Sequence, residues 1–300
     1  MPQSLLSNRA SLIIQAPRRR RLATESHPIA PIVSQLDVHD LGQAKCSSHL
    51  HDVDAILKHT GILKIRLGFV DNESSYLQQL ITGLSQQHGH QLPISHSATR
   101  GWFWDVRPSF DSFQTANHQA RSETMERFPW HTDCSYEDPT PRYFALQVIQ
   151  HDRRGGGTLS VMNVERLVSL LPSATREALS KAEFESKIPP EFIKNLVKKS
   201  TICSLLSSEN ALTSNRTVMR FREDILAPLT ERAGNALAEM RQALRAASDD
   251  PASTLHLSSE RDMPTGTILL VDNRRWLHAR NEARDQNRHL RRVRWDAVPF

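Results

Sequence analysis

The stretch FPWHTD at residues 128–133 contains the only His-x-Asp triplet in a chain that has 14 histidines. Strand signals follow it. The run PRYFALQVI at 141–149 is rich in β-branched and aromatic residues, and GGGT at 155–158 then turns the chain into a second strand. Side chains two positions apart on an extended segment leave the same face, so we expect His131 and Asp133 to be able to bind one metal ion together.

The strand signals return near the C-terminus, at Gly266–His278 and Arg288–Arg292. On its own, a His-x-Asp triplet is more often a surface loop or a satisfied core pair, so its meaning depends on these surroundings. A distant imidazole at His278 completes a 2-His-1-carboxylate set with three open positions. That geometry suits non-haem Fe(II) and oxygen chemistry.

Together these segments resemble the taurine dioxygenase-like (TauD/TfdA) family of Fe(II)- and 2-oxoglutarate-dependent oxygenases, from about Gly61 to Phe300. Four motifs fall in family order: WHTD at 130–133, GGT at 156–158, DNR and a histidine from 272 to 278, and RHL and an arginine from 288 to 292. The resemblance implies a mainly β protein with flanking helices around a double-stranded β-helix, the jelly-roll or cupin-like barrel. The strand signals alone leave a β-sandwich open.

The resemblance also implies a set of site residues. His131, Asp133 and His278 would bind Fe(II), while Arg288 and Thr158 would bind the distal carboxylate of 2-oxoglutarate. Arginine suits that role because its planar fork binds a carboxylate through two hydrogen bonds. The implied reaction uses O2 to hydroxylate or desaturate a small organic acid or amino-acid-like metabolite, with release of succinate and CO2.

Substrate contacts are expected at four further residues. Arg292 lies four positions after Arg288 and shares its face on a strand; in the taurine-like branch the matching arginine holds an anionic group of the substrate, although here it could instead pair with a carboxylate. Trp102, Trp104 and Arg107 precede the metal motif by about the distance at which the family places substrate contacts. Alternation puts the two tryptophans on one face, where core packing is the usual role of such a pair.

Two other functions use the same kind of fold. A metal-dependent hydrolase or isomerase would also use histidine and aspartate ligands, but it would not need Arg288 and Thr158 together. A non-catalytic jelly roll acting as a binding module would be favoured by a broken triad, and the triad is intact in this sequence.

Length and composition limit the class of protein. A chain of 300 residues with 38% hydrophobic content can bury one large core. No apolar run approaches the ~18 residues that cross a bilayer, so we expect no membrane association. The three cysteines are widely spaced and match no zinc signature, which indicates free thiols in a reducing compartment. We therefore expect a cytoplasmic or mitochondrial protein that is not secreted.

The net charge of +5 is confined to the N-terminus. Residues 1–24 hold five arginines and no acidic residue, which leaves 33 basic residues against 33 acidic ones in the rest of the chain. A neutral body offers no broad surface for a nucleic acid. The expected partner is a small anionic molecule, and a homo-oligomer is compatible with the sequence.

The chain divides into a tail and one domain. Residues 1–38 are predicted to be a basic tail and linker, either disordered or a mitochondrial targeting peptide. Residues 39–300 are the dioxygenase domain, with a largely helical insertion at about 164–250 that covers one end of the barrel as a lid or a subunit contact. Before the metal motif, the patterns predict helices at 53–58 and 74–86 and a strand at 62–67.

Overall fold

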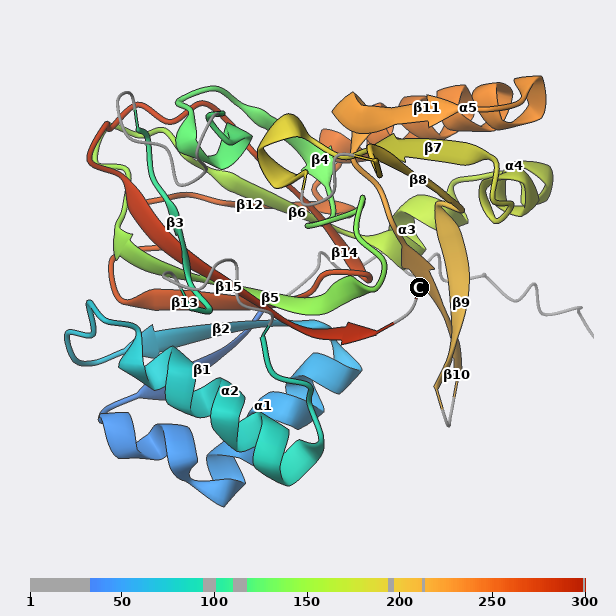
Figure 1. Ribbon diagram of the computed structural model, residues 1–300. Helices are drawn as coiled ribbons and strands as arrows, with labels where there is room; N and C mark the ends of the chain where they lie inside the picture. The colour runs from blue at the N-terminus through green and yellow to red at the C-terminus, as the bar shows by residue number, and fades with distance from the viewer. Residues whose placement is uncertain (1–32, 94–100, 110–117, 194–196, 212–213, 299) are drawn as a thin grey trace, which may run out of the picture.

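A computed structural model describes residues 33–93, 101–109, 118–193, 197–211, 214–298 and 300. Two sheets lie face to face (Figure 1). The larger has six strands in the order β1 (Ser34–Val38), β2 (Ile62–Leu67), β13 (Thr267–Asp272), β5 (Thr140–Gln150), β15 (His289–Val298) and β3 (Trp104–Val106). The smaller has four, in the order β12 (Thr254–Leu257), β6 (Leu159–Asn163), β14 (Trp276–Arg280) and β4 (Phe128–His131). This arrangement confirms the expected double-stranded β-helix.

The alternation of side chains along β5 explains why this strand is central. Phe144, Leu146 and Val148 point into the cluster between the two sheets. Tyr143 and Ala145 point to the opposite side, into the cluster beneath the helices. Because both faces of the strand are buried, its sequence reads as a nearly continuous apolar run rather than as alternating apolar and polar residues.

Two helices cover the outer face of the larger sheet, α1 (Ser47–His59) and α2 (Ser75–His88) (Figure 1). The predicted helix at 74–86 is confirmed as α2, and the one at 53–58 is the second half of the longer α1. Leu77, Leu80, Ile81 and Leu84 are the buried stripe of α2. Within the ranges given above, no helix is both long and apolar enough to cross a membrane.

The predicted linker needs a correction at its end. Residues 34–38 form β1, which pairs in parallel with β2. The strand was missed because it is only five residues long and its alternation is carried by Leu36 and Val38 alone. Residues 1–32, including the basic tail, lie outside the described residues.

The insertion at 164–250 is also less helical than predicted. It contains α3 (Val164–Ser169), α4 (Ser173–Leu179) and α5 (Glu231–Ser248), but also the short strands β7 (Phe184–Lys187), β8 (Ser200–Cys203), β9 (Leu206–Ala211), β10 (Ser214–Met219) and β11 (Leu226–Pro228). Strands of three to six residues are too short to give a clear period in the sequence. Helix α5 packs against α4, β11 and α3, and its apolar stripe belongs to a hydrophobic cluster beside the barrel (Figure 1).

Candidate functional site

The candidate metal centre lies where β4 pairs with β14. The antiparallel register sets His131 directly opposite His278, with ring centroids 4.0 Å apart. Asp133 adds a carboxylate whose Oδ1 is 3.7 Å from Nε2 of His131 and 3.8 Å from Nε2 of His278. The ligand atoms of the three side chains all lie within 4.8 Å of one another, and all three residues are buried.

Asp133 does not lie on an extended segment, as was expected from the sequence. Strand β4 ends at His131, and Asp133 lies in the turn that follows. Cys134 has a φ of 54°, which redirects the chain immediately afterwards. The carboxylate is therefore placed by the turn rather than by strand alternation.

The pKa shifts of His278 and Asp133 suit metal binding, which needs neutral imidazoles and an ionised carboxylate. His131 Nδ1 lies 2.8 Å from the carbonyl oxygen of Pro129. When Nδ1–H donates to that oxygen, Nε2 carries no proton, and its lone pair faces Asp133. Burial and the neighbouring His131 hold the pKa of His278 well below its usual value. Burial alone would raise the pKa of Asp133, but Arg292 and His131 hold it well below its usual value. Asp133 Oδ2 is buried without a hydrogen-bond partner, as expected of an atom that takes a metal.

Asn273, in the turn between β13 and β14, holds the backbone of Asp133. Its Oδ1 accepts a hydrogen bond of 2.6 Å from the amide of Asp133. Its Nδ2 donates to the carbonyl oxygens of Asp133 at 3.0 Å and Pro141 at 2.9 Å. Asn273 belongs to the DNR motif at 272–274, but nothing local to it in the sequence indicates a partner 140 positions away.

An inner cavity opens beside the metal centre, and Arg288 lies in its wall. The residues that line it are Val106, Ser122, Phe128, His131, Phe144, Leu146, Leu159, His278, Ala279, Arg280, Arg288, Leu290 and Arg292. Arg288 is 4% exposed, and its Nε and Nη1 have no hydrogen-bond partner. Burial, with Arg280 nearby, lowers its pKa to about 9. Burying a guanidinium without a partner costs free energy, and an anion bound in this cavity would supply the missing opposite charge.

The glycine turn packs directly against Arg288. Gly157 has a φ of +66°, and a Cβ added there would lie 2.8 Å from Arg288 Nε, so only glycine fits. Thr158 is half-buried, and its carbonyl oxygen accepts from the amide of Asn281 at 3.1 Å. Thr158 is not among the residues that line the inner cavity, and its contact with 2-oxoglutarate stays a prediction.

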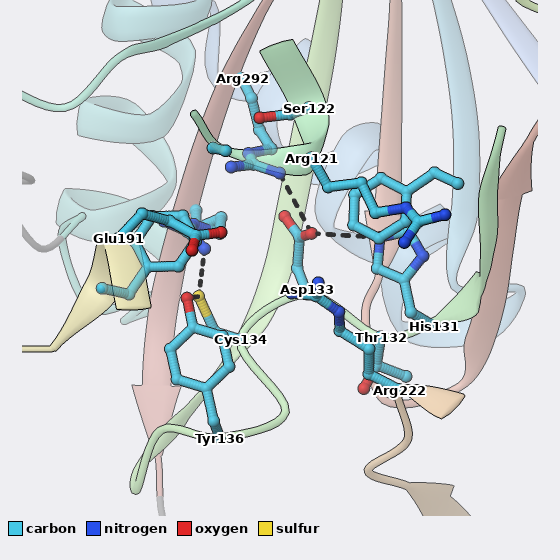
Figure 2. Close-up of a pocket in the computed structure, with 14 residues that line it drawn as sticks. Arg121, Ser122, His131, Thr132, Asp133, Cys134, Tyr136, Glu191, Arg222 and Arg292 are labelled. Carbon is cyan, nitrogen blue, oxygen red and sulfur yellow. Dashed lines mark hydrogen bonds and ion pairs between the residues drawn. The ribbon is translucent and has the colours of Figure 1, made fainter. Parts of the chain in front are cut away.

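A second cavity, called the outer cavity below, is lined by His131 and Asp133 (Figure 2). Its lining residues are Ala120, Arg121, Ser122, Phe128, His131, Thr132, Asp133, Cys134, Tyr136, Glu191, Phe192, Arg222, Arg292 and Arg294. Arg292 belongs to both cavities. Its Nη1 donates to Asp133 Oδ1 at 3.2 Å, while its buried Nε has no hydrogen-bond partner. Arg292 thus contacts the candidate ligand Asp133 and lines the inner cavity with Arg288, although Arg288 precedes β15 and does not lie on the strand as expected.

The three other predicted substrate contacts do not line either cavity. Trp104 is buried between the sheets, and its Nε1 donates to Ser122 Oγ at 3.3 Å. Trp102 precedes β3 and packs against the cluster beneath the helices, so the two tryptophans do not share a face as predicted. Arg107 is exposed. Their contact with substrate stays a prediction that the lining of these two cavities does not support.

Several cavity residues were not anticipated, and Arg222 is the clearest example. It comes from the insertion, forms an isolated bridge with His131, and donates from Nε and Nη2 to Asp224 at 2.8 and 3.0 Å. Its guanidinium also lies 5.2 Å from the ring centre of Phe128. The only sequence signal was the charged run RFRED at 220–224, which indicates a surface as readily as a site.

A family model and a curated relative match this chain. The family model "Taurine catabolism dioxygenase TauD, TfdA family" matches residues 25–294, which extends the resemblance to the N-terminal side of Gly61. An L-asparagine oxygenase of Streptomyces coelicolor is 30% identical over 159 residues, which are 51% of this chain and only 41% of that relative.

Solved structures share the fold. An asparagine oxygenase in complex with Fe(II), 3-hydroxyasparagine and succinate superposes with a TM-score of 0.65 at 18% identity, over 85% of this chain and 82% of that one. The non-heme iron oxygenase OrfP in complex with Fe and alpha-ketoglutaric acid gives 0.60 at 14% identity, over 84% of this chain and 79% of that one.

Replacing Asn273 should weaken metal binding. Asn273→Ala removes the side chain that fixes the backbone of Asp133, and loss of such an outer contact typically lowers metal affinity by about 10- to 100-fold. Titration of the apoprotein with Mn(II) or Co(II) measures this. The control is Asn163→Ala, which removes the cap of α3 and should lower the unfolding free energy by about 1 kcal/mol without changing metal affinity. Equal metal affinity in both variants would contradict the assignment.

Proposed function

Because the chain belongs to the TauD/TfdA family, we propose that it is an Fe(II)- and 2-oxoglutarate-dependent dioxygenase of a small amino-acid-like metabolite. The observation that carries this proposal is the buried, unpaired Arg288 in the cavity that His278 also lines. A jelly roll that only binds a ligand, or one that holds a hydrolytic metal, needs no such guanidinium beside its triad.

The described residues have separable roles in this proposal. His131, Asp133 and His278 hold Fe(II), which with bound 2-oxoglutarate supplies the oxidation of substrate by O2. Arg288 binds the distal carboxylate of 2-oxoglutarate, and the absence of a side chain at Gly157 leaves room for that arginine. Apolar side chains of the inner cavity, among them Phe144, Leu146, Leu159 and Leu290, exclude water from the reacting groups.

We assign the substrate to the outer cavity, with its acid group on Arg292. The free Nε of Arg292 supports this, because it is a buried donor without a partner at the junction of the two cavities. The relatives also support an amino-acid-like substrate, since one is named an L-asparagine oxygenase and OrfP has been solved with (3S)-hydroxy-L-Arg. The identity of the substrate decides whether it is hydroxylated, desaturated or oxidised in another way.

The proposed setting is the cytoplasm or the mitochondrion. All three cysteines, Cys46, Cys134 and Cys203, are free, which supports a reducing compartment. The arginines of residues 1–24 support a mitochondrial address. A nucleic acid or a membrane is not proposed as a partner, because the positive charge is confined to that segment.

Metal and co-substrate binding can be tested without a substrate. Anaerobic addition of Fe(II) and 2-oxoglutarate should produce the weak visible charge-transfer band of such complexes. His131→Ala should lose both this band and 2-oxoglutarate turnover, because one of three protein ligands is gone. His256→Ala is the matched control, since His256 is exposed and its Nδ1 contacts only Ser160 Oγ at 2.8 Å. An undiminished band in His131→Ala would refute the triad.

Loss of Arg288 should impair the co-substrate specifically. Arg288→Ala leaves a desolvated carboxylate without its charged partner, a loss of about 2 to 5 kcal/mol, so affinity for 2-oxoglutarate should fall by well over tenfold. Thr158→Ala should cause a smaller loss. Calorimetric titration of the Mn(II)-loaded protein measures both. An unchanged dissociation constant in Arg288→Ala would place the anchor elsewhere.

The role of Arg292 is tested through the substrate. Screening amino, sulfonic and carboxylic acids for stimulation of succinate formation should give an acid as the best substrate. Arg292→Ala should then raise KM while substrate-free 2-oxoglutarate turnover continues. Metal titration must accompany this test, because Arg292 also contacts Asp133. Arg291→Ala is the control, since Arg291 lies next in sequence but bonds to Asp105 at 3.1 Å. If the best substrate has no acid group, the proposed contact between Arg292 and the substrate is wrong.

A further inference from the structure

A second buried arginine, Arg280, lies in the inner cavity. It follows His278 by two positions on β14, so both side chains leave the same face of the strand. Arg280 is 7% exposed and lines the cavity together with Arg288 and Arg292. Among the described residues that line this cavity there are three arginines and no aspartate or glutamate.

Only part of the Arg280 guanidinium is engaged by the protein. Its Nη2 donates to the carbonyl oxygen of Thr124 at 3.0 Å and to that of Glu126. Its Nε is buried and has no hydrogen-bond partner. Carbonyl oxygens fix the direction of a guanidinium but do not neutralise it, so the charge of Arg280 is uncompensated by these contacts.

The two carbonyl groups that hold Arg280 belong to the segment leading into the metal-binding strand. Thr124 and Glu126 immediately precede β4 (Phe128–His131), and Arg280 is also the residue that pairs with Phe128 in the ladder. Arg280 therefore connects the anion cavity to the strand that carries His131 through both its backbone and its side chain.

The acidic group that attracts both Arg280 and Arg288 forms no hydrogen bond with either of them. Asp152 attracts both Arg280 and Arg288, but its two oxygens accept backbone amides of Arg154, Gly156, Arg284 and Asp285. Its charge is already held by a ring of amide donors. The cavity thus presents two guanidiniums, each with unused donors, to whatever anion enters it.

We propose that Arg280 is a second cation for the distal carboxylate of 2-oxoglutarate, and that it ties binding of that carboxylate to the position of His131. This inference rests on the proposed function. Because Arg280 is held in place by two carbonyl groups, little freedom is lost when the anion binds. The coupling is reciprocal: the metal at His131 and the anion at Arg280 should each tighten the binding of the other.

The test compares 2-oxoglutarate binding to Mn(II)-loaded protein by calorimetry in the wild type, Arg280→Gln and Arg280→Lys. We expect Arg280→Gln to weaken binding by at least about tenfold, and Arg280→Lys, which keeps the charge, to recover part of the loss. 2-Oxobutyrate, which lacks the distal carboxylate, should bind the three proteins equally. In Arg280→Gln, 2-oxoglutarate should also tighten Mn(II) binding less than it does in the wild type.

Arg275→Gln is the matched control for a purely structural role. Arg275 is also 7% exposed and also donates to carbonyl oxygens, those of Leu57, Lys58 and His59, but it is not part of the cavity. Both glutamine variants should lower the Tm of the apoprotein, and only Arg280→Gln should lose affinity for 2-oxoglutarate. If Arg280→Gln does not fold, Arg280→Lys decides by the same titrations.

Two failures can be told apart. A wild-type protein that binds Mn(II) but not 2-oxoglutarate would refute the proposed function itself. If the wild type binds 2-oxoglutarate, Arg288→Ala loses it, and Arg280→Gln binds it with wild-type affinity, then Arg280 is only structural and the inference is overturned. Equal weakening of 2-oxoglutarate and 2-oxobutyrate in Arg280→Gln would also overturn it, because the effect would not depend on the distal carboxylate.

Discussion

The antiparallel pairing of β4 with β14 is the constraint on which the rest of the site depends. It places His131 opposite His278 by backbone hydrogen bonds alone, before any ion is present. Strand β14 is held on its other edge by β6, so the second histidine lies in the interior of a sheet rather than on a loop. Only the carboxylate comes from a turn, and the three hydrogen bonds of Asn273 fix that turn to the strands. The candidate metal site is therefore organised by the protein itself.

The buried positive charges around this centre lower the stability of the folded protein. Arg280, Arg288 and Arg292 are all nearly inaccessible to water, and each has at least one nitrogen without a partner. Burying such groups lowers the stability of a protein unless an opposite charge is supplied. A fold selected only for stability would replace them with apolar residues of similar volume. We interpret their presence as a trade-off in which the protein is less stable but can bind anions.

The sequence predicted those parts of the molecule whose signals are local. Strand β5 is a run of mostly apolar residues, the turn after it is marked by three consecutive glycines, and the apolar stripe of α2 repeats within one helix. The triad was found because His131 and Asp133 are two positions apart and the family order supplied His278. Arg222, Asn273 and Arg280 were missed as site residues, because their partners in the site lie 91 to 156 positions away in the chain. Such pairs exist only after the sheets have closed.

The two cavities differ in where their walls come from. The inner one is built by β strands of the barrel and the loops between them, together with Ser122, whereas the outer one takes Glu191, Phe192 and Arg222 from the segment between β6 and β12. That segment has its own apolar cluster and its own small sheets. Substitutions within this one segment can therefore change the wall of the outer cavity without altering His131, Asp133 or His278.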